Sequence, residues 1–384
     1  MRVFFYIILY LISKSVWSYP NYIGHGYTSC LNCHYNPFGG GQLNDYGRAV
    51  SATAISSRAF YPKNWSDEKI ADSSGFLLRK PKQNWFRPQA NYRGFNLVTN
   101  PGSGSSEEKE WITMQMDVRA AVKFGENDKL IIFGDYGKLP PQQETIEGMT
   151  GKQKYRSRNH VIGYKVNKKV GVYAGFMDKV YGLRVIEHIA YSRELPRISQ
   201  IDQVHGVAGH FLLGEWEGGV HGFVGDLNQK TDFRMKGAST QWERTLFSSH
   251  RIGGSFLKSN NDYISLMSYA AHGRFNFKEG SALLVELGQT QKSHQQNIAD
   301  ATARYGLLQT YVRPYRGFYV FSNIEYLKND ISKSDYSIRV GPGIQYFPIQ
   351  RIELRADFYN TRNFGPSTAT RDAWMYLLQT HIWL

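Results

Sequence analysis

Residues 111–123, with the sequence WITMQMDVRAAVK, decide the fold that we expect for this chain. Apolar and polar side chains alternate along this stretch. One face of an extended strand would carry Ile112, Met114, Met116, Val118, Ala120 and Val122, and the other Thr113, Gln115, Asp117, Arg119 and Lys123. A period of two residues is the signature of a β-strand with one apolar and one polar face. The sequence therefore predicts an all-β structure whose sheet is apolar on one side and charged on the other.

The same alternation returns at residues 318–326 and 352–359 and in the last residues of the chain. In a soluble sandwich the apolar face would meet a second sheet. The final strand favours a membrane instead, because it resembles the C-terminal strand of outer-membrane barrels, with aromatic residues at one end of an apolar band. Leu384 departs from the terminal Phe of that pattern. The apolar face of this strand holds Trp374, Tyr376, Leu378, Thr380, Ile382 and Leu384.

We expect residues 85–384 to form a transmembrane antiparallel β-barrel of about 16 strands. Direct counts from the two ends give about 15, and because bacterial barrels use an even number we expect two short strands within residues 262–280. An even count places both barrel ends on the periplasmic side. Short turns should face the periplasm at 125–128, 167–169, 215–217, 259–262 and 347–350. Longer loops should face outward near 99–110, 139–153, 181–203, 228–245, 290–302 and 361–372.

The only two cysteines of the chain lie in the sequence Cys30-Leu31-Asn32-Cys33-His34. Cys-x-x-Cys-His is the attachment sequence of a c-type haem. Two thiols bind the two vinyl groups of one porphyrin, and the adjacent histidine ligates the iron. The motif therefore predicts one covalent haem c, held by Cys30 and Cys33 and ligated by His34.

Two other chemistries compete for this motif. A thioredoxin-type redox pair or disulfide would need the cysteines at the start of a helix in a βαβ setting, and no such pattern surrounds them. A structural zinc site usually takes four Cys or His ligands, and a second cysteine pair is missing. Both remain open alternatives to the haem.

Residues 26–48 resemble the monohaem c-type cytochrome segment found at the front of some porin-like outer-membrane proteins. The resemblance rests on Cys30, Cys33 and His34, the Asn36-Pro37 step, the Gly39-Gly40-Gly41 triplet and Asp45-Tyr46-Gly47-Arg48. It implies a haem-bearing segment ahead of a porin-like barrel. It spans about two dozen residues, so it indicates a cofactor rather than a particular partner or substrate.

The chain order predicts four parts. Residues 1–18 are expected to be a secretory signal peptide, with a basic start, a short apolar run and small residues near the cleavage position. The alternative, a retained anchor, would need about 20 apolar residues. Residues 19–61 form the haem-binding segment, residues 62–84 a linker without sustained period, and residues 85–384 the barrel. Export also suits the haem, because thiols are delivered to an oxidising compartment.

Within the haem-binding segment, residues 42–57 are compatible with a helix that carries Leu43, Tyr46, Val50 and Ile55 on one side. The glycine triplet permits backbone to lie against a porphyrin face, or is a flexible turn. Arg48 is a candidate partner of a haem propionate, whereas Asn44 and Asp45 are expected to cap and solvate the helix. For the sixth iron position His25 is the nearest candidate. Met177, His160, His210, His221 and His250 qualify only if the segment enters the barrel.

The formal net charge is +14 at neutral pH. No basic and aromatic face typical of nucleic-acid binding stands out, so we interpret the charge as lumen and loop character that would favour anions. Lumen-facing arginines are expected to bridge acids such as Glu353 and Asp357. The mean hydropathy of −0.45 is no objection to a barrel, whose strands alternate. The expected lumen arginines are Arg87, Arg93, Arg156, Arg158, Arg339 and Arg355.

The leading hypothesis is an outer-membrane porin-like protein with its haem on the periplasmic side, acting in electron transfer. Its partners would be outer-membrane lipid, periplasmic or cell-surface cytochromes and small solutes in the pore, with no nucleic acid. The alternative is a passive, anion-preferring diffusion channel whose haem segment is a structural plug. A weaker third hypothesis is peroxidase-like or gas-sensing chemistry at an open iron position. No hydrolase triad or phosphate-binding loop supports another enzyme class, so we expect a non-enzyme.

Overall fold

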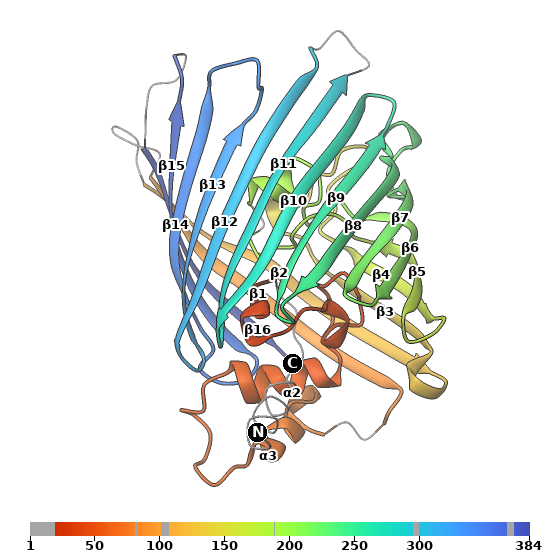
Figure 1. The fold of residues 1–384 in the computed structure, drawn as a ribbon, viewed down its shortest axis with the longest axis vertical. Helices are drawn as coiled ribbons and strands as arrows, with labels where there is room; N and C mark the ends of the chain where they lie inside the picture. The colour runs from red at the N-terminus through yellow and green to blue at the C-terminus, as the bar shows by residue number, and fades with distance from the viewer. Residues whose placement is uncertain (1–19, 81–82, 101–106, 188, 295–298, 367–371) are drawn as a thin grey trace, which may run out of the picture.

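Sixteen antiparallel strands close into one barrel, in which each strand pairs with its neighbours in sequence and β1 pairs with β16 (Figure 1). The computed structural model describes residues 20–80, 83–100, 107–187, 189–294, 299–366 and 372–384. The expected fold class and the total of sixteen strands are confirmed. The signal peptide expected at residues 1–18 lies outside the described residues. Among the described residues, no helix is long and apolar enough to cross a bilayer.

The strands are β1 Phe86–Asn100, β2 Glu108–Phe124, β3 Leu130–Lys138, β4 Tyr155–Lys165, β5 Val170–Met177, β6 Val204–Leu213, β7 Trp216–Gly225, β8 Lys236–Leu246, β9 His250–Asn260, β10 Ile264–Lys278, β11 Ser281–His294, β12 Ala301–Tyr315, β13 Phe318–Lys328, β14 Tyr336–Tyr346, β15 Ile352–Phe364 and β16 Asp372–Trp383. Odd-numbered strands run away from the end of the barrel where β1 begins and β16 ends. We call that end the terminal end and the opposite one the loop end.

The alternation in the sequence becomes an outer apolar face and an inner polar face. Val118 and Leu378 are 65% and 63% exposed on the outside, whereas Asp117 beside Val118 is 3% exposed. In β15 the side chains of Glu353 and Arg355 point inward and Leu354 points outward. Exposed apolar side chains of this kind lie around the wall, as a bilayer-facing surface requires.

The predicted faces of residues 111–123 are wrong at one end. The pairing of β1 with β2 shifts at Arg93 and Gly94, which leaves Met114 as an extra residue. A bulge of one residue exchanges the two faces beyond it. Ile112 is consequently buried and Trp111 exposed, the reverse of the strict alternation.

Two errors in the expected strand pattern cancel each other. Residues 262–280 were expected to hold two short strands, but they contain the single strand β10. The missing strand is β8, whose sequence lies in a stretch that the prediction assigned to a loop. The turn at 259–262 also joins β9 to β10 at the loop end, not at the periplasm-facing terminal end that we expected. β8 was missed because Lys236, Thr240 and Arg244 interrupt the apolar side chains of its outer face.

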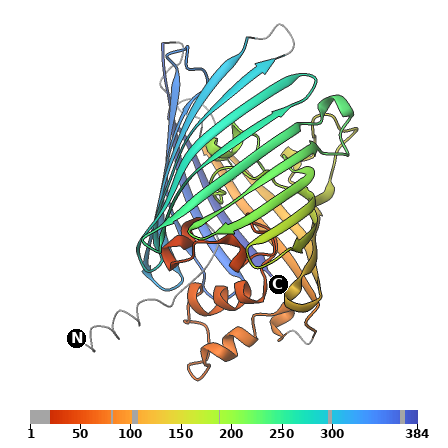
Figure 2. The same ribbon diagram turned by 45° about the vertical axis from the view of Figure 1, so that its right-hand side comes forward.

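Two segments enter the lumen from opposite ends of the barrel (Figures 1 and 2). The first, residues 20–56, we call the plug; the second, residues 178–203 between β5 and β6, we call the inward loop, and it contains α4 Tyr191–Glu194. This loop was predicted to face outward, but its apolar side chains are buried inside the wall. The plug contains the 3-10 helices Pro20–His25 and Cys30–Asn32, the helix α2 Asp45–Val50 and the π-helical turn Ser51–Ile55.

The stretch predicted as a linker, residues 62–84, contains the helix α3 Asp67–Asp72 and the 3-10 turn Phe76–Leu78. Ser66 caps α3 by accepting a hydrogen bond from the Lys69 amide at 3.3 Å. Ile70 of this helix is buried against Ala52 of the plug and Tyr61. The helix therefore packs beneath the plug at the terminal end of the barrel (Figure 1).

The plug has no core of its own and shares each apolar cluster with the wall. Tyr22, Cys33 and Ile55 pack with Tyr319 and Phe347. Tyr35 packs on the other side against wall residues such as Phe133. A segment of this size cannot bury enough apolar surface alone, so the wall supplies the other half of each cluster.

Candidate functional site

The cysteine motif forms a tight turn in the interior of the barrel. The amides of Cys33 and His34 both donate to the carbonyl oxygen of Cys30, at 3.2 and 3.1 Å. Cys33 and His34 are buried, and Cys30 is half-buried. Asn44 caps the following helix α2 by accepting from the Gly47 amide at 2.8 Å, as expected from the sequence.

Cys30 and Cys33 are not joined by a disulfide in the structure. Burial raises the pKa of the Cys30 thiol to about 11, so it is uncharged at neutral pH. A neutral thiol is a poor nucleophile, which disfavours the thioredoxin-type alternative in the folded state. Within the described ranges, no three or more His, Cys, Asp or Glu side chains gather in a way that would hold a metal ion.

The glycine triplet is a structural requirement at this site. Gly39, Gly40 and Gly41 all have positive φ, at +83°, +73° and +68°, which side chains with a Cβ rarely adopt. A Cβ on Gly39 would also lie 3.3 Å from the Cys30 Sγ. The backbone therefore passes close to the first thiol and exposes a flat strip without side chains.

A chamber lies between the plug and the inward loop. It offers about 1500 Å³ not filled by protein atoms, part of it open to solvent. Cys30, His34 and the glycine triplet line it from the plug, Asp178–Ile186 line it from the inward loop, and the wall closes the remaining sides. Seven lysines and arginines face four acids in its lining: Arg93, Arg119, Arg158, Lys179, Arg184, Arg193 and Arg274 against Asp135, Asp178, Glu217 and Glu243.

A second cavity lies behind the motif and is mostly apolar. Cys33, Leu43, Ile55, Phe347 and Trp383 are among its lining residues, and about 580 Å³ is not filled by protein atoms. Five residues line both cavities: His34, Gly41, Asn91, Arg119 and His381. The proximal-ligand candidate therefore lies at the boundary between a polar chamber and an apolar cavity.

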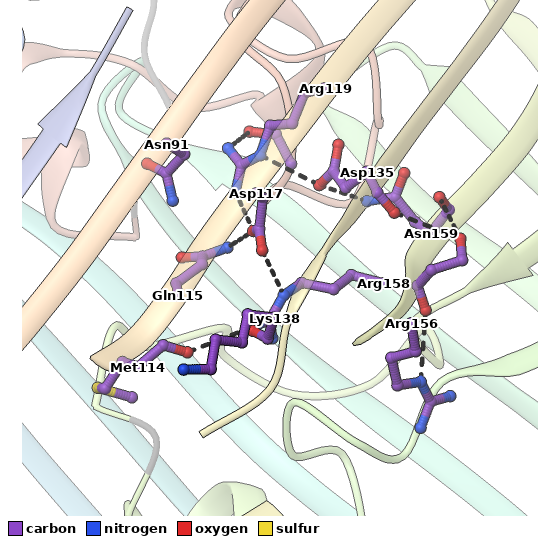
Figure 3. Close-up of polar contacts among 12 residues, drawn as sticks. Asn91, Met114, Gln115, Asp117, Arg119, Asp135, Lys138, Arg156, Arg158 and Asn159 are labelled. Carbon is purple, nitrogen blue, oxygen red and sulfur yellow. Dashed lines mark hydrogen bonds and ion pairs between the residues drawn. The ribbon is translucent and has the colours of Figure 1, made fainter. Parts of the chain in front are cut away.

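An arginine and acid network on β2, β3 and β4 forms one wall of the chamber (Figure 3). Arg158 Nε donates to Asp117 Oδ1 at 2.9 Å, and Asn159 donates to Asp135 at 2.8 Å. Arg119 lies 3.4 Å from the carboxylates of both acids and donates to the Gly41 carbonyl oxygen. The network fixes the wall on which the end of the glycine triplet rests.

The expected lumen arginines are buried, and most bridge acids. Arg355 pairs with Asp357 at 2.7 Å, and Arg339 pairs with Glu325 at 2.9 Å. Glu353, which we expected to pair with an arginine, instead contacts His381 Nδ1 at 2.8 Å. Three other pairs are Arg156 with Asp226, Arg158 with Asp117 and Arg87 with Asp45.

The wall holds the plug through its backbone just before the first cysteine. Arg251 and Arg274 both donate to the carbonyl oxygen of Thr28, at 2.8 and 3.0 Å. Ser29 Oγ donates to Glu217 at 2.5 Å. These contacts place the motif at a fixed depth in the barrel.

Two sequence-predicted site residues lie away from the chamber. His25 Nε2 is 3.0 Å from the Tyr319 hydroxyl oxygen, and burial together with the nearby Arg313 charge lowers its pKa to about 4. Arg48 donates to the Pro88 carbonyl oxygen at 2.9 Å. Neither lines the chamber, so His25 as a distal ligand and Arg48 as a propionate partner are not supported by this arrangement.

Of the other ligand candidates, only His210 lines the chamber. His160 is exposed and contacts Ser157, and Met177 is buried in an apolar cluster with Tyr35. Sequence reasoning missed His381 and Arg184, which both line the chamber. Arg184 could not be found because it lies on a loop expected outside; a Cβ on Gly40 would contact its guanidinium at 3.8 Å.

No family model and no curated protein sequence matches this chain. Several solved structures, in contrast, are similar to it in fold. OmpT of Vibrio cholerae, in a loop L8 deletion mutant, matches with a TM-score of 0.60 and 9% identity, covering 78% of this chain and 99% of that chain. The outer membrane channel DcaP of Acinetobacter baumannii matches with a TM-score of 0.59 and 9% identity over 78% of this chain and 97% of that one.

An anion-selective porin from Comamonas acidovorans is also similar, with a TM-score of 0.56 and 9% identity over 78% of this chain and 99% of that chain. Identities this low are evidence for a shared fold and not for a shared activity. The chain therefore has the porin-like fold of a sixteen-stranded outer-membrane barrel.

Proposed function

We propose that this protein is a porin-like outer-membrane barrel that holds one covalent haem c in its chamber and acts in electron transfer at or across the membrane. One observation carries the proposal. Cys30 and His34 of the attachment motif line a large chamber, beside a glycine strip that leaves room for a flat ring. A haem-attachment motif in an unrelated structural role would not need such a space.

The residues present fit the cofactor. Cys30, which lines the chamber, and Cys33, which lines the apolar cavity behind it, would hold it covalently at the boundary of the two spaces, and His34 would ligate the iron. Arg119 and Arg184 lie beside Gly41 and Gly40, and their guanidinium groups are suited to bind propionates. When bound, haem would supply a one-electron couple.

A single haem at this depth does not bridge the apolar band of the membrane, which is about 25 Å tall. Electrons would have to be exchanged with periplasmic or cell-surface cytochromes, or with a soluble carrier that enters the lumen. The excess of basic side chains in the chamber favours an anionic carrier.

Spectroscopy of the purified protein tests the proposal. We expect a reduced-minus-oxidised difference spectrum of a c-type haem. In proteoliposomes supplied with a soluble anionic electron carrier, we expect electron delivery from one side to an acceptor on the other. A Cys30→Ser, Cys33→Ser variant is the matched control and should form the barrel without haem or electron delivery. A wild-type protein with no haem bands would refute the proposal.

A second candidate function is a passive, anion-preferring diffusion channel in which the plug is structural. Two observations favour it: a channel and an anion-selective porin are among the similar folds, and basic residues outnumber acids around the chamber. Conductance in planar bilayers separates the two functions. A diffusion channel should conduct equally under reducing and oxidising conditions, and should keep its conductance in the cysteine variant.

A further inference from the structure

His381 on β16 borders the same two cavities as His34, the chamber and the apolar cavity behind the motif. Besides these two, His210 is the remaining histidine of the described ranges that lines the chamber, and it does not line the second cavity. His381 therefore shares the space around His34 most closely.

The wall orients the His381 ring through its nitrogens. Nδ1 is 2.8 Å from Glu353 Oε2 and 3.2 Å from an Arg93 guanidinium nitrogen, and Nε2 is 2.5 Å from Asn91 Oδ1. We assign the ring proton to Nδ1, because the Glu353 carboxylate is its nearest partner and can only accept. The Arg93 nitrogen, which can only donate, then lies beside Nδ1 without a hydrogen bond to it. Nε2 is then an acceptor, and Asn91 satisfies it when its amide is turned so that Nδ2 donates.

A histidine held in this way is prepared for metal ligation. Metal-bound histidines commonly donate the second ring nitrogen to a carboxylate, which fixes the tautomer and the ring plane. Three strands hold the group together, since Asn91 and Arg93 are on β1, Glu353 on β15 and His381 on β16, and His381 pairs directly with Arg93 and Glu353 in the sheet. The Trp383 ring, 4.8 Å from the His381 ring, packs beside it.

We propose that His381 Nε2 is the second axial ligand of the iron, opposite His34. The proposal rests on the proposed haem function and deepens it. Two histidine ligands give a six-coordinate iron with a low reduction potential and no open position, which suits electron transfer and disfavours peroxide or gas chemistry. To bind, His381 exchanges its contact with Asn91 for the iron and keeps its contact with Glu353.

His210 provides the matched control. Its Nε2 is held by Glu217 at 3.0 Å, a carboxylate that also accepts from Ser29 and Arg251. The free nitrogen would be Nδ1, the one nearer the backbone, and the Phe38 ring packs edge-on at 5.6 Å. His210 thus lines the same chamber and contacts a carboxylate, but it does so through Nε2, the nitrogen that His381 would offer to the iron.

The test compares full-length wild type, H381Q, H381M and H210Q, purified in detergent from outer-membrane fractions. Haem staining and haem content come first, because they test the proposed function alone. Absorption and electron paramagnetic resonance spectra then report the ligands. We expect a low-spin bis-histidine iron in wild type and H210Q, and a high-spin iron in H381Q that binds carbon monoxide and returns to low spin with added imidazole.

H381M should retain a low-spin iron with a raised reduction potential, since methionine ligation raises it. Haem present in all variants with H381Q still low-spin and unable to bind carbon monoxide would overturn the His381 assignment and leave the haem function standing. Absence of haem would overturn both. Should H381Q fail to assemble, the wild-type spectrum decides by itself, because a high-spin or histidine–methionine signal there contradicts the assignment.

Discussion

The plug and the inward loop fill the same lumen but are held in different ways. The wall holds the plug largely through the plug backbone. Arg251 and Arg274 donate hydrogen bonds to the Thr28 carbonyl oxygen, and the Gly280 amide donates to the Gly24 carbonyl oxygen at 2.7 Å. The inward loop combines backbone contacts with a buried charge of its own. The amides of Gly182 and Tyr191 donate to Ser255 and Glu325, and the Glu187 side chain is bound to Arg355 and to Gln309. Both meet at the chamber, so its shape depends on two independent sets of contacts.

This difference bears on how each segment tolerates substitution. Backbone contacts do not depend on the side chains of the plug and therefore tolerate their substitution. Ion pairs buried beneath the inward loop depend on each partner, because a single buried charge left unpaired is strongly destabilising. We therefore expect the two anchors to respond to different perturbations.

The largest expected effect is at the anchor of the inward loop. Arg355→Met would leave Glu187 and Asp357 buried without their cation and should lower the free energy of unfolding by about 3–5 kcal/mol. Chemical unfolding in detergent measures this loss. Adding Glu187→Met and Asp357→Leu to the same chain should recover most of it, because no uncompensated charge remains.

Arg362→Met is the matched control, since Arg362 pairs with Asp372 at 2.7 Å on the exposed surface. Exposed pairs contribute little, so no measurable loss is expected. Equal losses in the Arg355 and Arg362 variants would show that the inward loop is not anchored by buried charge.

The second largest effect is expected at low pH, which should weaken the docking of the plug in the barrel. The pKa of His25 is lowered from 6.5 in the unfolded chain to about 4 by burial and Arg313, so between these values the unfolded state binds more protons. The docked plug is fully stabilised above pH 6.5 and loses up to about 3 kcal/mol as the pH falls to 4. Limited proteolysis of the plug at pH 7 and pH 4.5 measures the effect.

His25→Gln removes this titration and should protect the plug at pH 4.5 relative to wild type. Both chains should be cut at similar rates above pH 6.5. The same acid-induced cutting in wild type and in the glutamine variant would mean that groups other than His25 control docking of the plug.

The smallest effect is expected at the glycine strip. Gly39→Ala places a Cβ at φ +83° and 3.3 Å from the Cys30 Sγ, which should cost about 1–2 kcal/mol within the plug. Haem loading should fall while the barrel stays assembled. Gly222→Ala on β7, where a Cβ would meet no atom within 4 Å, is the control and should load normally. Unchanged haem loading in Gly39→Ala would show that the glycine triplet is not part of the haem site.

The wall could be predicted from the sequence because each strand is a local pattern. The alternation of apolar and polar residues located β2, β13, β15 and β16. The rule that bacterial barrels have an even number of strands gave the total of sixteen. The pattern failed where local chemistry departs from it, at the bulge at Met114 and in β8, whose polar outer positions resemble a loop. Both failures concern register and boundaries, which pairing with neighbouring strands decides.

The site was predictable only in part, because its residues are separated along the chain. The Cys30–His34 motif is contiguous and could be identified directly. Arg184 and His381 join it only when the inward loop folds into the lumen and β16 closes against β1. The length of a loop does not indicate the direction in which it folds, and cross-sheet neighbours depend on register.

Haem content of the full-length protein tests the central claim most directly. Outer-membrane fractions extracted with detergent are separated on a denaturing gel, stained for haem, and the purified chain is assayed for haem per polypeptide. We predict a haem band at the size of the chain that resists denaturation, with one haem per polypeptide, lost in the Cys30→Ser, Cys33→Ser variant. A colourless wild-type barrel from the same fractions would contradict the account.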